Sequence, residues 1–167
     1  MSYRAGRHFL QIPGPTNVPD RVLRAMSRPT IDHRGPEFQA LGYELLESVR
    51  EVFKTTHPVV IFPASGSGAW EAALVNCLSP GDRILMVETG QFATLWKQIA
   101  ERLGLEVDWI PGDWRHGVDP AAVETRLADD QDHAIKAVCV VHNETSTGVV
   151  SRIAQVRHAL DRARDQF

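Results

Sequence analysis

The chain has 167 residues, of which 43% are hydrophobic and 23% charged, and its formal net charge is -3 at pH 7. This composition is typical of a globular protein, and the charge balance gives no electrostatic preference for nucleic acid or for a membrane surface. No apolar run approaches the ~20 residues of a membrane-spanning helix, and residues 1–10 are too polar for a secretory signal, so we expect a cytoplasmic protein.

The first third of the sequence predicts a rigid loop and two helices. Residues 11–19 hold three prolines and a glycine, which favour an extended loop over a helix. A short helix is expected over 20–27. A longer one should begin near Pro36, because apolar residues then recur at three- and four-residue spacing and form a face that should pack: Phe38, Leu41, Leu45, Val49, Val52 and Phe53.

A short apolar run, residues 59–62, predicts a buried strand that leads into a serine- and glycine-rich turn and a helix over 70–78. The first amides of a helix are unpaired and carry the positive end of its dipole, so they attract an anion. Ser65 and Ser67 add hydroxyl donors that suit a phosphate. An ordinary helix cap made by a serine is equally compatible with this pattern.

The remainder alternates between the two element types. Strands are predicted over 83–88, 105–110 and 136–141, and helices over 92–103, 119–127 and 151–165. This order predicts an α/β fold with a mostly parallel sheet and helices on both faces. Since ligands of such sheets bind beyond the carboxyl ends of the strands, the turns at 64–71, 88–92 and 143–148 should converge on one pocket.

Cysteines and histidines give no sign of a metal site. Cys77 and Cys139 lie among apolar neighbours and are expected to be buried, reduced thiols. The seven histidines are scattered without ligand spacing, so no metal is expected.

Two other phosphate-binding patterns are less favoured. A P-loop is excluded, since no Gly-Lys-Ser/Thr follows the turn at the required offset. In a dinucleotide-binding fold, Gly66 and Gly68 would open the helix and Glu88 would take the place of the ribose-binding acid. The sixth position of that motif is Glu71 instead of glycine, which argues against it.

Five motifs in a fixed order resemble those of a known family. They are Pro-Gly-Pro-Thr at 13–16, His-Arg at 33–34, Ser-Gly-Ser-Gly-Ala-Trp-Glu-Ala-Ala at 65–73, Glu-Thr-Gly-Gln-Phe at 88–92 and His-Asn-Glu-Thr-Ser-Thr-Gly at 142–148. The chain is similar to the N-terminal portion of class V pyridoxal-phosphate-dependent aminotransferases of the serine/alanine/aspartate:glyoxylate group. The resemblance implies an N-terminal substrate-gate loop over 1–19. Residues 20–167 would form an incomplete large domain of the type I pyridoxal-phosphate-dependent transferase fold.

The resemblance also implies roles for single residues. Ser65, Gly66 and Ser67 would hold the phosphate of pyridoxal 5'-phosphate, in agreement with the anion argument. Phe92 would stack on the pyridine ring, and Thr145 would bond the phenolic oxygen of the cofactor. From residues alone, Phe92 is equally consistent with a core position and Thr145 with an ordinary turn.

Within the N-terminal loop, the same resemblance places Gly14 beside the amino-acid substrate. The reaction implied is transfer of an amino group from serine, aspartate or alanine to glyoxylate, in a homodimer. In the family, the lysine that binds the cofactor covalently lies beyond the part that this sequence matches, so no catalytic residue is assigned here. Lys54, Lys97 and Lys136 are expected to be solvated. The alternative is a non-catalytic fragment or dimerisation module.

Overall fold

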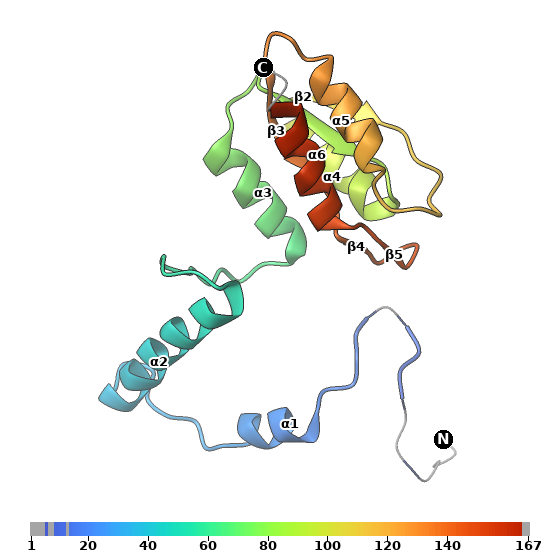
Figure 1. Ribbon diagram of the computed structural model, residues 1–167. Coiled ribbons are helices and arrows are strands. Elements are labelled where there is room, and N and C mark those ends of the chain that lie inside the picture. Colours follow the sequence, from blue (N-terminus) through green and yellow to red (C-terminus); the bar gives the residue numbers. More distant parts are fainter. Residues whose placement is uncertain (1–5, 7–8, 13, 165–167) are drawn as a thin grey trace. The chain divides into compact units, whose positions relative to one another are not determined.

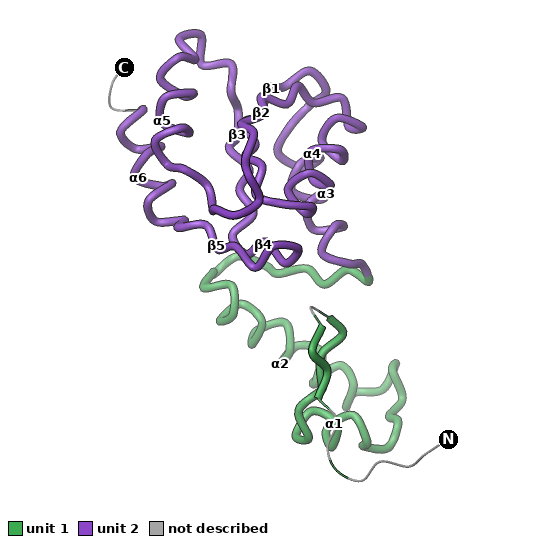
Figure 2. Tube along the Cα trace, turned by 90° about the vertical axis from the view of Figure 1, so that its right-hand side faces the viewer, with its two compact units in different colours: residues 1–63 green, residues 64–167 purple. Residues whose placement is uncertain are grey.

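The computed structural model describes residues 6, 9–12 and 14–164 and divides the chain into two compact units, residues 1–63 and 64–167 (Figures 1 and 2). The first unit contains helices α1 (Asp20–Met26) and α2 (Pro36–Phe53). The second contains α3 (Gly66–Cys77), β1 (Arg83–Val87), α4 (Gln91–Arg102), β2 (Glu106–Ile110), α5 (Pro120–Ala128), β3 (Ile135–Cys139), β4 (Asn143–Glu144), β5 (Val149–Val150) and α6 (Ile153–Arg164). No helix in the described ranges is long and apolar enough to cross a membrane.

The main sheet has three parallel strands in the order β2-β1-β3. β1 pairs with β2 in continuous register from Arg83–Glu106 to Val87–Ile110. Its pairing with β3 contains an irregularity between Arg83 and Ile84. Helices link successive parallel strands, as this strand direction requires. The predicted mostly parallel α/β architecture is therefore confirmed.

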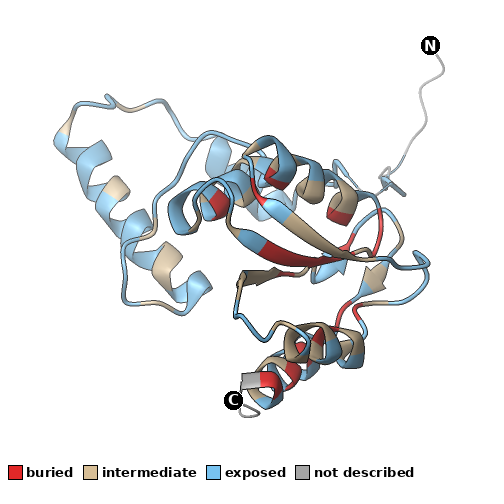
Figure 3. Ribbon diagram, turned by 90° about the horizontal axis from the view of Figure 1, so that it is seen from above, coloured by how far each residue is buried: buried red, intermediate tan, exposed pale blue. Residues whose placement is uncertain are grey.

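β1 lies at the centre of two hydrophobic clusters, one on each face of the sheet (Figure 3). Ile84 and Met86 point to the face that also holds residues of α3 and α4, and Leu85 and Val87 point to the face that holds residues of α5 and α6. This alternation follows from the two-residue repeat of a strand. Helices on both faces bury all four side chains, which confirms the predicted layer arrangement.

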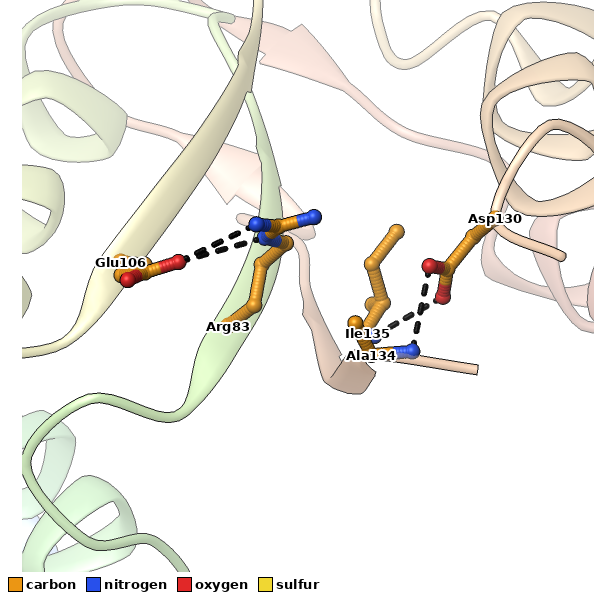
Figure 4. A network of polar contacts seen from close by, with 5 residues as sticks. All are labelled: Arg83, Glu106, Asp130, Ala134 and Ile135. Carbon is orange, nitrogen blue, oxygen red and sulfur yellow. Dashed lines mark hydrogen bonds and ion pairs between the residues drawn. The ribbon is translucent and has the colours of Figure 1, made fainter. Parts of the chain in front are cut away.

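At the amino end of the sheet, polar contacts fix where the strands begin (Figure 4). The Asp130 carboxylate accepts hydrogen bonds from the amides of Ala134 at 3.1 Å and Ile135 at 2.8 Å. Arg83 pairs with Glu106 across β1 and β2, with Nη2 and Oε2 3.2 Å apart. Both side chains of that pair are largely exposed, so the ion pair contributes little to stability.

Two short strands that the sequence did not predict follow β3. The predicted strand over 136–141 ends at Cys139, and the chain then enters the antiparallel hairpin of β4 and β5. The Gly148 amide donates to the Glu144 carbonyl at 2.8 Å, and Gly148 has a φ of 76°, which glycine adopts without strain. The loop 143–148 that contains this turn contacts the start of α4.

The predicted buried strand over 59–62 is wrong. The structure has no strand there, and Val60, Ile61 and Phe62 are all exposed. A β-strand needs a neighbouring backbone for its hydrogen bonds, and the described residues provide none for this segment. An apolar run favours burial in general, but it contains no information about a pairing partner or about what would cover it.

The predicted packing face of α2 is also exposed. The helix itself is confirmed at Pro36–Phe53, but none of its described side chains is buried. Its larger apolar residues have 42–78% of their surface exposed, namely Phe38, Leu41, Leu45, Val52 and Phe53. The three- and four-residue spacing therefore predicts the helix without predicting what covers it.

Of the two cysteines, only Cys139 is buried as predicted, whereas Cys77 at the end of α3 is exposed. Burial raises the pKa of the Cys139 thiol to about 11. The thiolate is the nucleophile in thiol modification. Burial, which blocks access, and the raised pKa, which lowers the thiolate fraction, should therefore both slow the modification of Cys139.

We expect an aromatic disulfide reagent at pH 8 to modify Cys77 rapidly, because this residue is exposed to solvent. Cys139 is buried and should be modified only as the protein unfolds. Release of the coloured thiol, followed by absorbance, measures both phases. Cys77→Ser should remove the fast phase alone. Fast reaction of one thiol per chain in the Cys77→Ser variant would contradict the burial of Cys139.

A matched pair of valines tests the core of the second unit. Val123 on α5 is fully buried, whereas Val75 on α3 is 51% exposed. Val123→Ala should lower the free energy of unfolding by about 1.5–3 kcal/mol, through lost burial and a residual cavity. Val75→Ala should change it by about 0.5 kcal/mol or less. Urea denaturation followed by tryptophan fluorescence measures both, and equal effects would contradict this core.

Candidate functional site

A buried carboxylate joins the loop after β3 to the start of α4. Glu144 is 1% exposed, and its two carboxylate oxygens accept different backbone amides of α4. The Phe92 amide donates to Oε1 at 3.2 Å and the Ala93 amide donates to Oε2 at 3.1 Å. The first amides of a helix have no partner within it. Glu144 therefore caps α4 from a loop far away in the sequence.

Ser146 completes this cap. Its hydroxyl donates to Glu144 Oε1 at 2.7 Å and accepts the Gln91 amide at 2.9 Å. The Ser146 amide donates to the same carboxylate at 3.2 Å. The first three amides of α4 thus all have acceptors from the loop 143–148, so this helix terminus has no amide left for an outside anion.

Gly90, directly before α4, permits the close approach of the two loops. A Cβ atom at this position would lie 2.6 Å from both Glu144 Cγ and Ser146 Oγ, far inside van der Waals contact. Any other residue at 90 would separate the helix terminus from its cap. Gly90 is therefore required by the geometry of the cap.

The cap sets the protonation state of Glu144. Burial by itself raises the pKa of its carboxyl group. The hydrogen bonds from the Ser146 hydroxyl and from the amides of Ala93, Phe92 and Ser146 together outweigh burial, so the pKa lies below its ordinary value. The carboxylate is therefore ionised at neutral pH, where its charge also complements the helix dipole.

The start of α3 differs from that of α4. Ser65 stands at the N-cap position with an extended backbone, but its side chain makes no capping hydrogen bond. The Gly68 amide closes the turn on the Ser65 carbonyl at 3.0 Å. No acceptor for the amides of Gly66 and Ser67 is found among the described residues, and both positions are exposed. The ordinary serine cap that the sequence left open is thus not formed.

The two glycines of this turn, Gly66 and Gly68, have different structural roles. A Cβ atom on Gly68 would lie 2.7 Å from the Ala64 Cβ, so glycine is required for the turn to close. A Cβ atom on Gly66 would meet nothing within 4 Å. The space beside Gly66 is therefore open for close approach of a ligand to the backbone.

Aromatic contacts connect the starts of α3 and α4. The Phe92 ring meets Trp70 edge to face, with centroids 6.0 Å apart and an interplanar angle of 71°. Trp70 in turn stacks on Trp96, with centroids 5.4 Å apart and an angle of 18°. Both are favourable aromatic geometries. Phe92 is half-buried, so its ring is held by Trp70 while part of it stays accessible.

Thr145 lies between the two capping residues. It is exposed, and no hydrogen bond of its hydroxyl to another described residue is found. Farther along the loop, the Thr147 hydroxyl donates to the Thr89 carbonyl at 3.3 Å. The Thr89 hydroxyl is itself fully buried and has no partner among the described residues. The predicted loops at 88–92 and 143–148 are therefore joined by several hydrogen bonds.

Glu88 is already occupied by contacts within the chain. Its carboxylate accepts the Gly112 amide at 3.1 Å and the Trp114 indole N–H at 2.7 Å. A Cβ atom on Gly112 would lie 2.0 Å from the Glu88 carbonyl oxygen, which shows how closely this loop packs. A ribose-binding acid needs free oxygens, so the position of Glu88 argues against the dinucleotide-binding alternative.

Two predicted features take no part in the hydrogen bonds of this cap. Gly14 belongs to the first unit, where a Cβ atom would meet nothing within 4 Å, and its neighbour Pro13 lies outside the described residues. No strand precedes α3 in the described residues, and its Trp70 contacts Phe92 at the start of α4. No group of three His, Cys, Asp or Glu side chains in the described ranges is suited to a metal ion.

Sequence reasoning missed Glu144 and Ser146. The signal was present as an acidic residue and a serine directly after a buried strand. Their function as a helix cap was not visible, because the amides they bind are 51–55 residues away. Capping patterns recognised from sequence lie within one turn of the helix that they cap.

The fold and these contacts define an α/β protein in which one helix terminus is capped from within and a neighbouring one is open. The chain belongs to the class-V aminotransferases, since the model of that family, Aminotransferase class-V, matches residues 8–165. This confirms the family resemblance, and membership implies pyridoxal phosphate as the family's cofactor.

Relatives and a solved structure agree with this assignment. The chain is 48% identical to a serine–glyoxylate aminotransferase of Arabidopsis thaliana, over 95% of this chain and 40% of that protein. It is 46% identical to an L-aspartate–glyoxylate aminotransferase of Paracoccus denitrificans, over 92% of this chain and 39% of that protein. An aspartate aminotransferase structure from Thermus thermophilus matches with a TM-score of 0.81 and 27% identity, covering 95% of this chain and 44% of that one. The chain thus spans about 40% of the length of these curated relatives. Its α/β fold matches part of the solved aspartate aminotransferase.

The lowered pKa of Glu144 predicts a pH-dependent contribution to stability. A carboxyl whose folded pKa is lowered stabilises the protein above its unfolded pKa, and this stabilisation is lost as the pH falls through the folded value. The difference in unfolding free energy between the native chain and Glu144→Gln should therefore be constant above about pH 5 and shrink at lower pH. Urea denaturation at a series of pH values measures it.

Glu71→Gln, on the exposed surface of α3, serves as the matched control, because Glu71 has the same side chain without the buried cap. If the difference in unfolding free energy between the native chain and Glu144→Gln were the same at every pH, the assigned role of the carboxylate would be contradicted.

Proposed function

We propose that the second unit supplies the phosphate and ring subsites of a pyridoxal-phosphate-dependent aminotransferase. The observation that carries this proposal is the contrast between two helix termini. α4 is capped by Glu144 and Ser146, whereas the amides of Gly66 and Ser67 at the start of α3 have no acceptor among the described residues. A phosphate dianion fits the open terminus and not the filled one.

The residues at the α3 terminus fit the phosphate group chemically. Ser65 and Ser67 would donate hydroxyl hydrogen bonds beside the amides, and Gly66 leaves space for close approach. No carboxylate of the described chain has a hydrogen bond at this turn. The amides of Gly66 and Ser67 and both serine hydroxyls can therefore donate hydrogen bonds to an anion.

The ring subsite would be formed by Phe92 and Thr145. Phe92 offers an aromatic face that Trp70 keeps in one orientation, and the exposed Thr145 hydroxyl is available to bond an oxygen of the cofactor. When bound, the protonated pyridine ring of pyridoxal phosphate supplies an electron sink for chemistry at the amino-acid Cα. The residues of this chain would bind and orient that ring without exchanging protons with the substrate.

For the whole enzyme we propose amino-group transfer from serine, aspartate or alanine to glyoxylate. The two relatives are named as serine–glyoxylate and aspartate–glyoxylate aminotransferases, which supports glyoxylate as the shared acceptor. Residues 1–19 would form the substrate-gate loop, with Gly14 beside the amino acid, and residues 20–167 the incomplete cofactor-binding domain. Association as a homodimer is part of the same proposal.

The positions of the lysines favour a narrower activity for this chain alone. Lys97 Nζ pairs with Glu101 at 2.5 Å on the surface of α4, and Lys136 Nζ donates to the His133 carbonyl at 3.4 Å. Lys54 ends α2 in the first unit. Within the described part of the second unit, neither Lys97 nor Lys136 makes a hydrogen bond or ion pair with the turns at 64–71 and 143–148. A chain with this set of lysines would hold the cofactor reversibly and without a covalent bond.

Replacing both serines tests the phosphate subsite. Ser65→Ala/Ser67→Ala should weaken binding of pyridoxine 5'-phosphate at least about tenfold, because two charge-assisted hydrogen bonds are lost. Pyridoxine phosphate is preferred as the probe since it lacks the aldehyde that reacts with lysines. Equilibrium dialysis measures its binding.

Unphosphorylated pyridoxine and the variant Ser79→Ala are the controls. Ser79 is an exposed serine after α3 whose amide, and not its hydroxyl, makes a hydrogen bond. Neither pyridoxine binding by the double variant nor pyridoxine phosphate binding by Ser79→Ala should change. Unaltered binding of pyridoxine phosphate by the double variant would refute the proposed phosphate subsite.

A further inference from the structure

The residues assigned to the cofactor ring come from segments about fifty residues apart, and one buried group connects them. Phe92 lies in the first turn of α4, Thr145 lies in the turn between β4 and β5, and the Glu144 carboxylate accepts the Phe92 amide. The distance between the Phe92 ring and the Thr145 hydroxyl is therefore set by this contact and its neighbours, and not by either element alone.

Thr145 is held from both sides. Its preceding residue, Glu144, binds the amides of α4, and its following residue, Ser146, binds the Gln91 amide. The Gly148 amide closes the same turn on the Glu144 carbonyl at 2.8 Å. The backbone of Thr145 is thus fixed while its side chain stays exposed, which is the arrangement that a ligand-binding hydroxyl requires.

Phe92 is held in the same way. Its backbone amide donates to Glu144, and its ring packs edge to face against Trp70, which is stacked on Trp96. The side chain cannot shift along the helix axis without breaking the cap, nor turn without leaving Trp70. Both residues of the ring subsite are therefore positioned by groups that do not themselves face the ligand.

We propose that Glu144 and Ser146 are positioning residues for the cofactor ring, which hold Phe92 and Thr145 at a fixed spacing through the first amides of α4. This inference rests on the proposed function and adds to it residues that neither the anion argument nor the aromatic contact requires. It makes the ring subsite dependent on the cap of α4, whereas the phosphate subsite at α3 is independent of that cap.

The variant Glu144→Gln preserves side-chain volume but replaces one acceptor oxygen by an NH2 group, which faces an amide N–H of α4. Its affinity for pyridoxine 5'-phosphate should fall about tenfold, as expected when a hydrogen bond to a charged group is lost. Its affinity for inorganic phosphate should stay within about twofold, because phosphate alone occupies the α3 terminus. Calorimetric titration with each probe measures both constants, and retained phosphate binding shows that the unit remains folded.

The double variant Glu144→Gln/Phe92→Ala separates positioning from general stabilisation. If Glu144 acts through Phe92, Glu144→Gln should weaken binding markedly less in the Phe92→Ala background than in the native chain. Equal losses in both backgrounds, or equal losses for phosphate and pyridoxine phosphate, would overturn the inference. Ser146→Ala is a milder second variant that keeps the carboxylate. It should also weaken binding of pyridoxine 5'-phosphate more than binding of inorganic phosphate, but by a smaller factor than Glu144→Gln.

Glu124→Gln is the matched control, because Glu124 on α5 pairs with Arg162 on the protein surface, away from both helix termini. It should leave both affinities unchanged. Failure of the phosphate assignment is recognised separately, since Ser65→Ala/Ser67→Ala would then leave inorganic phosphate binding intact. In that event the effect of Glu144→Gln on unphosphorylated pyridoxine still decides the positioning role.

Discussion

The arrangement of the site depends on the contact between the buried Glu144 carboxylate and the first turn of α4. A carboxylate removed from water is costly unless hydrogen-bonded, and unpaired amides at a helix terminus are costly for the same reason. Here each group satisfies the other, with Ser146 taking the remaining amide. Separating the two loops would leave both sets of groups unpaired. The segments around Gly90 and Thr145 therefore behave as one body.

The same contact explains why two neighbouring helix termini have different chemistry. The dipole of α4 is already balanced by a fixed negative charge, and a second anion there would be repelled. α3 has no such charge at its start, and Ser65 does not use its hydroxyl as a cap. The position of the protein's own carboxylate thus supports the proposal that an outside anion binds at the start of α3.

Local patterns in the sequence predicted most of the second unit. The helix expected over 119–127 is α5, with Pro120 in its first turn and the Asp119 side chain accepting the Ala121 amide at 3.0 Å. Such signals are contained within a few residues, so they can be read directly. The cap of α4 could not be read, because its donors and acceptors are about fifty residues apart. The strand prediction for residues 59–62 was wrong for a related reason, because an apolar run favours burial without specifying a partner strand.

The division of the chain at residue 63 gives the two parts of the proposed site different physical support. In the second unit, β1 is buried on both faces, so the helix termini that carry Ser65 and Phe92 are anchored to a closed core. In the first unit, α2 has no buried residue and its apolar face is exposed. Gly14 lies in that unit, in which no described residue is buried. We therefore expect cofactor binding to be a property of the second unit by itself, and the substrate-gate role proposed for residues 1–19 to require that the apolar face of α2 be covered.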